Sequence, residues 1–215
     1  SKEFMNVLEL TENGWAKDYI LTEHIMNSMD STKQQDFVFC ITVEGHGDYP
    51  EEPVIKNPEI KLLGVADEGT KNAWEYYVNH LYETDKFIAE LIAALEEREE
   101  PTVLIMYGDH LPTMGLEATD LKSRYLFNTN YVVWDNIGLE AEDRNLPTYQ
   151  LMADVFEKLC EELGICDARI WGKEKTVAKF SDGTKMKLML ANVFARKTDA
   201  LLLDEQLPVN LRLML

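Results

Sequence analysis

The sequence TVLIMYGDHLP, residues 102–112, joins a short apolar run to a polar turn. Val103 to Tyr107 contain no alternating polar residue, a pattern typical of a strand buried on both faces of a sheet. Gly108 allows the backbone to turn sharply, and Asp109 and His110 follow at the carboxyl end of the strand. This arrangement favours an open α/β sheet, in which ligands bind outside the carboxyl ends of the strands.

Asp109 and His110 combine a hard carboxylate with an imidazole, a pair suited to Zn²⁺, Mn²⁺ or a similar divalent ion. The alternative is an ordinary polar loop, in which Asp109 caps the next segment and His110 is solvated. The dipeptide alone does not separate these interpretations.

A second loop repeats the pattern. Residues 36–43 (DFVFCITV) are rich in β-branched and aromatic residues and predict a strand. Residues 44–48 (EGHGD) follow, with two glycines around His46, although a turn with an exposed histidine would have the same composition. The ends of parallel strands can converge on one crevice, so we predict that His46, Asp109 and His110 lie together on one face of the sheet.

A long amphipathic helix is predicted between these strands, from about Thr70 to Arg98. We expect His80 and Asp85 on its surface, solvated or hydrogen-bonded. Strand, crossover helix and strand would form one right-handed βαβ unit. The predicted apolar stripe contains Trp74, Tyr77, Val78, Leu81, Ile88, Leu91, Ile92 and Leu95.

Further elements complete the expected fold. A helix is predicted from an Asp18 cap through Met29, a strand over residues 130–134 and a helix over residues 148–163. The fold class is therefore α/β, a mainly parallel sheet flanked by helices. A change in composition near residue 168 divides residues 1–168, the α/β part, from residues 169–215, a β-rich tail with a hairpin at 175–190.

Composition excludes several classes of protein. The 215 residues carry a formal net charge of −18, which argues against a nucleic-acid partner. No apolar run approaches the roughly 20 residues that span a bilayer, and residues 1–10 do not resemble a signal peptide. An odd count of 3 cysteines argues against a disulfide framework, and Cys40 is expected in the core.

Three segments together resemble the carboxyl-terminal half of the lipoteichoic acid synthase-like sulfatases. They are GWAKD at 14–18, DFVFCITVEGHGDYP at 36–50 and VLIMYGDHLP at 103–112. That family comprises bacterial phosphoglycerol transferases of the alkaline phosphatase superfamily, and the resemblance covers about residues 13–164.

The resemblance implies roles for three residues. Asp109 and His110 would bind the catalytic divalent metal, which could be Mn, Mg, Zn or Ca. His46 would be catalytic and substrate-binding, contacting the phosphate or sulfate being transferred or the leaving oxygen. The expected substrate is an anionic phosphate or sulfate ester, including lipid-linked ones.

The resemblance also implies missing parts. The family's threonine nucleophile, a further acidic metal ligand and its membrane-spanning segments all lie upstream of the motifs found here. We therefore expect this chain to be an incomplete enzyme: soluble, inactive alone, a weak metal binder and prone to self-association. The full-length protein would act at the outer face of a bacterial membrane, bound there only through those upstream segments. Glu44 and Asp48 place negative charge on both sides of His46.

Two other functions remain open at this point. One is a sulfatase or phosphodiesterase that acts on small soluble esters through the same metal pair. The other is a non-catalytic acidic domain that binds a metal or ligand without turnover.

Overall fold

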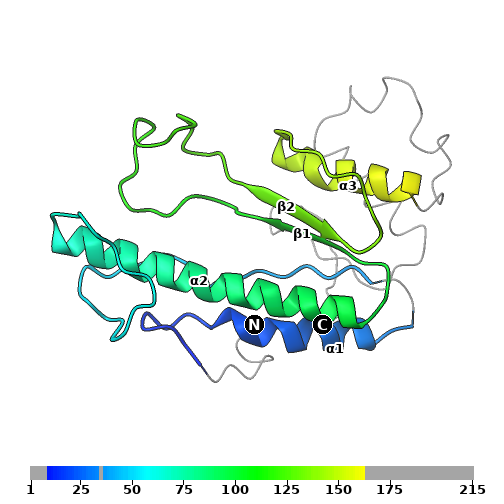
Figure 1. The fold of residues 1–215 in the computed structure, drawn as a ribbon, viewed down its shortest axis with the longest axis horizontal. Coiled ribbons are helices and arrows are strands. Elements are labelled where there is room, and N and C mark those ends of the chain that lie inside the picture. Colours follow the sequence, from blue (N-terminus) through cyan, green and yellow to red (C-terminus); the bar gives the residue numbers. More distant parts are fainter. Residues whose placement is uncertain (1–8, 34–35, 163–215) are drawn as a thin grey trace, which may run out of the picture. The chain divides into compact units, whose positions relative to one another are not determined.

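The computed structural model describes residues 9–33 and 36–162. Its elements are a 3-10 helix η1 and helices α1, α2 and α3 with strands β1 and β2 (Figure 1). The chain divides into two compact units. Among the described residues, the first unit contains 9–33 and 38–134 and the second contains 36–37 and 135–162. The predicted tail at 169–215 and its hairpin lie outside the described residues. In chain order the elements are η1 (Asp18–Ile20), α1 (Leu21–Asp30), α2 (Glu68–Glu97), β1 (Val103–Tyr107), β2 (Tyr131–Asp135) and α3 (Thr148–Glu162).

Helix α2 is the longest element, with 30 residues. The Asp67 side chain accepts a hydrogen bond of 2.7 Å from Thr70 N–H and so caps its first turn. The buried face differs from the predicted stripe. Leu81, which belongs to the stripe, is 49% exposed, whereas the polar residues Asn79 and His80 are buried. The buried positions, three or four residues apart in most cases, are Ala73, Tyr76, Asn79, His80, Phe87, Leu91 and Leu95.

The core of the first unit joins two helices and the sheet. Leu21 of α1 packs with Phe87, Leu91 and Leu95 of α2. Further residues of η1, α1 and α2 and one residue from each strand pack around this cluster. Helices α1 and α2 therefore cover a face of the β1–β2 sheet (Figure 1). The surrounding partly buried residues are Ile20, Ile25, Met26, Met29, Ile88, Leu104 and Trp134.

Strands β1 and β2 form a two-stranded sheet and run antiparallel (Figure 1). The hydrogen bond from Gly108 N–H to Asn130 O, 3.2 Å long, pairs the end of β1 with the start of β2. Helices and a small sheet confirm the expected α/β class in part, whereas the strand pair in the described residues is antiparallel rather than parallel. A long loop, rather than a crossover helix, returns the chain beside β1, and such a return pairs strands antiparallel.

Residues 36–43 do not form the predicted strand. A strand requires a hydrogen-bonded neighbour, and in the part of the chain that the structure describes β1 and β2 form a sheet with each other alone. The stretch is an extended trace (Figure 1) whose side chains are largely accessible: Ile41 is 69% exposed and Cys40 is exposed rather than in the core. The expected βαβ unit is therefore not formed.

The second unit contains α3, close to the predicted helix. Before this helix, Asp135 Oδ1 accepts hydrogen bonds from the N–H groups of Ile137, Gly138 and Leu139. Glu142 forms ion pairs with Arg144 and Lys158. Leu151 and Val155 of α3 are buried.

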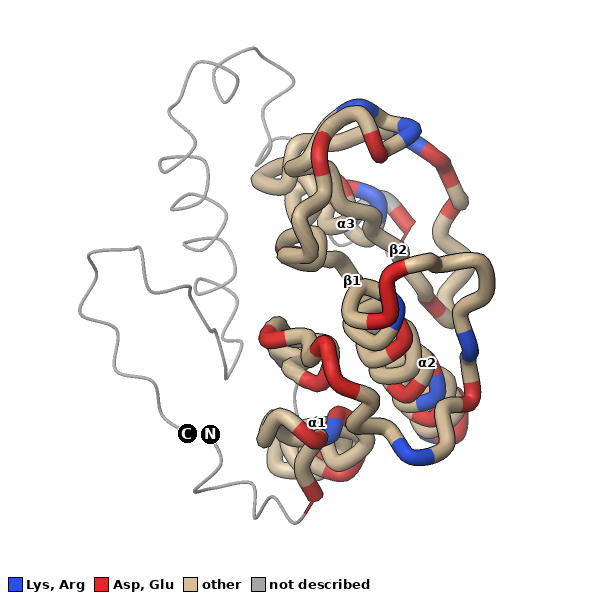
Figure 2. The backbone as a smooth tube through the Cα atoms, turned by 90° about the vertical axis from the view of Figure 1, so that its left-hand side faces the viewer, with Lys and Arg blue, Asp and Glu red and all other residues tan. Residues whose placement is uncertain are grey.

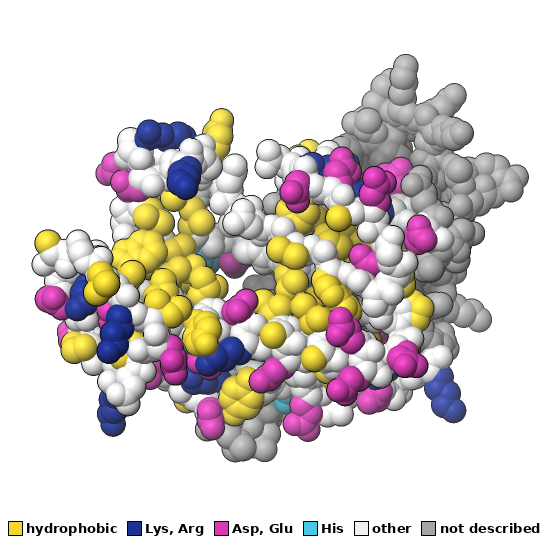
Figure 3. Space-filling view, in the orientation of Figure 1, with side chains coloured by type: hydrophobic (Ala, Val, Ile, Leu, Met, Phe, Trp, Pro, Cys, Tyr) yellow, Lys and Arg dark blue, Asp and Glu magenta, His cyan; other side chains and the backbone are white. Residues whose placement is uncertain are grey.

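Acidic residues outnumber basic ones along the described chain (Figure 2). Hydrophobic side chains also reach the surface on the face drawn in Figure 3. Among the large exposed ones, Leu63 and Phe127 are 91% and 95% exposed. Within the residues that the structure describes, no helix is long and apolar enough to cross a membrane.

Candidate active site

The Asp109–His110 turn leaves β1 beside the start of β2. Thr129 Oγ1 donates a hydrogen bond of 2.6 Å to Gly108 O, and this contact fixes the backbone just before the two candidate ligands. Asp109 Oδ1 accepts a hydrogen bond of 2.8 Å from His110 N–H. The side chains themselves remain accessible, 83% for Asp109 and 57% for His110.

The geometry of this pair fits a divalent ion. The His110 ring places Nδ1 at 2.9 Å from Leu111 O, so the tautomer with a proton on Nδ1 donates to this carbonyl. That tautomer leaves the Nε2 lone pair free for a metal, as a second hydrogen bond commonly arranges for metal-binding histidines. Asp109 Oδ2 lies 3.7 Å from Nε2. Two ligands at this separation can share one ion at bonds of about 2.0–2.2 Å.

His46 lies next to this pair. Its N–H donates to Val43 O at 3.1 Å, which closes the turn after the extended stretch. The ring of His46 lies near two other rings, with its centroid 4.4 Å from that of Trp15 and 6.5 Å from that of His110. The structure thus brings together His46 and the Asp109–His110 turn, as the sequence predicted, although the first loop does not follow a strand.

Trp15 belongs to a tight turn. Gly14, the residue before it, adopts a φ of 81°, which favours glycine. Thr11 N–H donates to Trp15 O at 2.7 Å, and Trp15 N–H donates to the Thr11 hydroxyl at 3.1 Å. This turn presents the indole to His46.

Sequence reasoning missed a buried charged cluster beside the site. Glu44 and Asp18 are each 1% exposed and His80 is 3% exposed. His80 was expected on the helix surface and Asp18 as a helix cap, and both expectations are wrong. The spacing of His80 from Tyr76 and Phe87 on α2 was the available signal, because it places His80 on the buried face.

The two buried carboxylates have opposite pKa shifts. Burial raises the pKa of Asp18, and the nearby charge of Glu44 adds to the increase. Burial would also raise the pKa of Glu44, but hydrogen bonds from His80 and the Asp18 backbone, with the charge of Lys17, lower it overall. Glu44 is therefore ionised, and its carboxylate binds inside the cluster. The sequence had instead suggested that its charge lies beside His46.

Among the described residues, no three or more His, Cys, Asp or Glu side chains gather closely enough to enclose a metal ion. Asp109 and His110 alone would therefore offer an ion two ligands, whereas a protein site of this type has about three or four.

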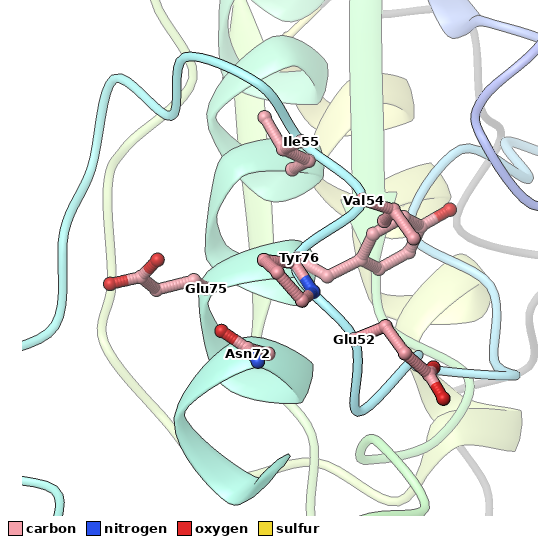
Figure 4. Close-up of a pocket in the computed structure, with 7 residues that line it drawn as sticks. Glu52, Val54, Ile55, Asn72, Glu75 and Tyr76 are labelled. Carbon is pink, nitrogen blue, oxygen red and sulfur yellow. The ribbon is translucent and has the colours of Figure 1, made fainter. Parts of the chain in front are cut away.

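A shallow pocket at the start of α2 (Figure 4) differs in its chemistry from the site at His46 and the Asp109–His110 turn. Two of its lining side chains, Glu52 and Glu75, are acidic and would repel an anionic ester. None of the predicted site residues lines it. The remaining lining residues are Pro53, Val54, Ile55, Asn72 and Tyr76.

Comparisons with known proteins agree with the motif. The family model described as Sulfatase matches residues 5–165. A protein of Rhizobium meliloti (strain 1021), named "Putative cyclic beta-1,2-glucan modification protein", is 31% identical over 101 residues. The aligned region covers 47% of this chain and 16% of that protein. No solved structure matches significantly.

Proposed function

Because the chain belongs to the sulfatase family, we propose that its two histidine loops form part of the active site of a metal-dependent enzyme acting on sulfate or phosphate esters. The observation that carries this proposal is the approach of His46 and His110, whose ring centroids are 6.5 Å apart. The two loops are far apart in sequence, and each supplies side chains suited to an anionic ester or its metal.

The three residues have different proposed roles, which follow from the chemistry of their side chains. Asp109 and His110 would hold the ion through Oδ2 and Nε2, the two atoms that lie 3.7 Å apart. When bound, a divalent ion neutralises negative charge on the transferred group and activates a hydroxyl nucleophile. His46 donates a hydrogen bond or proton to an oxygen of the same group. The nucleophile and the remaining ligands come from outside the residues assigned here.

The substrate class that we favour is a phosphoglycerol donor with a carbohydrate acceptor. The resemblance to lipoteichoic acid synthase-like enzymes supports phosphoglycerol transfer at the outer face of a bacterial membrane. The name of the Rhizobium relative, which concerns modification of a cyclic glucan, supports a carbohydrate acceptor. A sulfatase or phosphodiesterase acting on small soluble esters is the second candidate, favoured by the family description.

Metal titration tests the assigned ligands. We expect weak but saturable Mn²⁺ binding by the chain, measured by calorimetry and by electron paramagnetic resonance. His110→Ala should weaken it about tenfold or more, because a metal ligand matters at least as much as the partners that orient it. His24→Ala, on α1, is the matched control and should bind Mn²⁺ like the wild type. Equal affinity of the His110 and His24 variants would refute the metal assignment.

Anion binding tests His46 separately. Inorganic phosphate and sulfate are titrated against the Mn²⁺-loaded chain, and His46→Ala should weaken anion binding while leaving Mn²⁺ affinity unchanged. An activity assay of the polypeptide that its gene encodes would distinguish the two candidate functions. Transfer of phosphoglycerol to a glucan would support the first, and hydrolysis of a small sulfate ester would support the second. Anion binding unaffected by His46→Ala would remove His46 from the proposed site.

A further inference from the structure

The buried cluster beside the site links three segments of the first unit. Asp18 comes from the amino-terminal segment, Glu44 directly precedes the Gly45-His46 turn, and His80 lies on α2. Two less buried side chains of the amino-terminal segment, Lys17 and the exposed Glu12, pair with this cluster at its edge. The proposed reaction uses none of these side chains, yet burying charges is costly unless they are paired. Their pairing therefore needs a structural or functional reason.

His80 bridges two carboxylates. Its Nδ1 lies 3.1 Å from Glu44 Oε1 and its Nε2 lies 3.1 Å from Glu12 Oε2. Both ring nitrogens of His80 therefore lie within hydrogen-bonding distance of a carboxylate oxygen. Lys17 Nζ lies 3.4 Å from the same Glu44 oxygen, and Tyr76 packs against the imidazole with ring centroids 4.3 Å apart. His80 and Lys17 thus both contact the buried Glu44 carboxylate.

The carboxylates in turn hold the backbone that leads to His46. Asp18 Oδ1 accepts hydrogen bonds from Val43 N–H at 3.0 Å and Glu44 N–H at 3.3 Å. Glu44 Oε2 accepts from Asp18 N–H at 2.8 Å, so the two segments bind each other reciprocally. Asp18 Oδ2 also accepts from the Thr84 hydroxyl on α2 at 3.0 Å. The chain is therefore fixed two residues before His46.

Further contacts hold the loop after His46. The Tyr49 hydroxyl donates to Gly45 O at 3.2 Å, and burial raises the pKa of this tyrosine to about 12, which keeps it a donor. The Asn13 side chain donates to Asp48 O. The turn that carries Trp15 is thus joined to the loop that carries His46 at more than one point.

We propose that Glu44 and His80 are positioning residues, which hold His46 against Trp15 and so beside the Asp109–His110 turn. This inference rests on the proposed function for the role of His46, but its geometric part can be tested without metal or substrate. Glu44 acts through its backbone and its carboxylate, and His80 acts through Glu44. The expected consequence of removing either is a displaced His46 ring.

The test is nuclear magnetic resonance of the histidine rings in the full chain, with four histidines to assign. The indole of Trp15 changes the chemical shifts of the His46 ring protons, and Trp15→Leu gives these shifts without the indole. In His80→Ala, and independently in the near-isosteric Glu44→Gln, the His46 chemical shifts should move towards the values found in Trp15→Leu. Thermal unfolding of each variant is measured in parallel.

Asn79→Ala is the matched control. Asn79 is also buried on α2, 7% exposed, but its side chain bonds to Ile60 and Glu75 O rather than to the His46 loop. If His80 had a merely structural role, His80→Ala and Asn79→Ala would both lower the unfolding temperature and would both leave the His46 resonances unchanged. Unchanged His46 resonances in His80→Ala or in Glu44→Gln would overturn the proposal.

A second measurement separates this inference from the proposed function. Phosphate binding to the Mn²⁺-loaded chain should weaken about tenfold in Glu44→Gln, as for a typical outer partner of a site, while Mn²⁺ affinity stays unchanged. Failure of the wild type to bind Mn²⁺ would count against the proposed function alone, since the resonance shifts do not depend on metal. If the His46 resonances shift in Glu44→Gln but its phosphate affinity is unchanged, the position of His46 does not affect anion binding. That result would overturn the functional part of the proposal.

Discussion

At the scale of single residues, the paired shifts of Asp18 and Glu44 make stability depend on pH in opposite directions. Burial raises the pKa of Asp18, so the folded state binds its proton more tightly than the unfolded state. This contribution favours folding at low pH and is lost as pH rises through the raised pKa. Glu44 has a lowered pKa, so its contribution is present above the ordinary value and lost as pH falls through the lowered one.

The substitution Asp18→Asn should therefore be tolerated best at neutral pH. Its side-chain oxygen can still accept from Val43 and Glu44 N–H, while the buried charge and its repulsion with Glu44 are gone. The stability of the variant relative to wild type should fall as pH is lowered from about 7.5 to about 4.

Urea unfolding across this range measures the effect, with Glu44→Gln as the contrasting variant. Glu44→Gln should lose stability most at neutral pH and approach the wild type in acid. The same pH dependence in both variants would contradict the opposite shifts.

At the scale of elements, helix α2 organises the first unit through one face. Leu91 is 4% exposed in the core cluster, whereas Leu81 of the same helix is 49% exposed. Leu91→Ala should destabilise the protein by about 2–5 kcal/mol, because it leaves a cavity among packed side chains. Leu81→Ala should cost about 0.5 kcal/mol or less. Urea unfolding compares the two, and similar losses would show that the buried face has been misplaced.

At the scale of the whole molecule, high negative charge and exposed apolar surface act against each other. Ile41 is 69% exposed in the stretch 36–43, which does not form a strand, and exposed apolar groups favour association. We expect copies of the chain to associate weakly, since the net charge of −18 opposes contact. Association should increase between about 0.1 and 1 M salt, as the Debye length falls from about 10 to about 3 Å.

Sedimentation velocity tests this expectation. Ile41→Lys should reduce association, whereas Asn27→Lys, an exposed position on α1 with the same change in charge, should reduce it less. Equal behaviour of the two variants would show that charge alone sets the association and that the apolar stretch has no part in it.

The sequence by itself determined the elements whose signals are local. Strand β1 was predicted at its observed bounds, and the two later helices and β2 were predicted within about two residues, because apolar periodicity and end signals lie within each segment. The convergence of His46 with the Asp109–His110 turn was also predicted, from two similar loops after apolar runs. The residue types are suited to a divalent ion and an anionic group, and their roles stay a prediction that rests on the family resemblance.

Only the tertiary structure decided which partners each segment finds. The run 36–43 has the composition of a strand, but a strand exists only when another backbone pairs with it, and none does in the described residues. His80 was predicted at the surface because the polarity of one residue does not reveal the carboxylates that meet it. Those carboxylates, Glu12 and Glu44, lie 68 and 36 positions away in the chain, so only folding brings them to the imidazole.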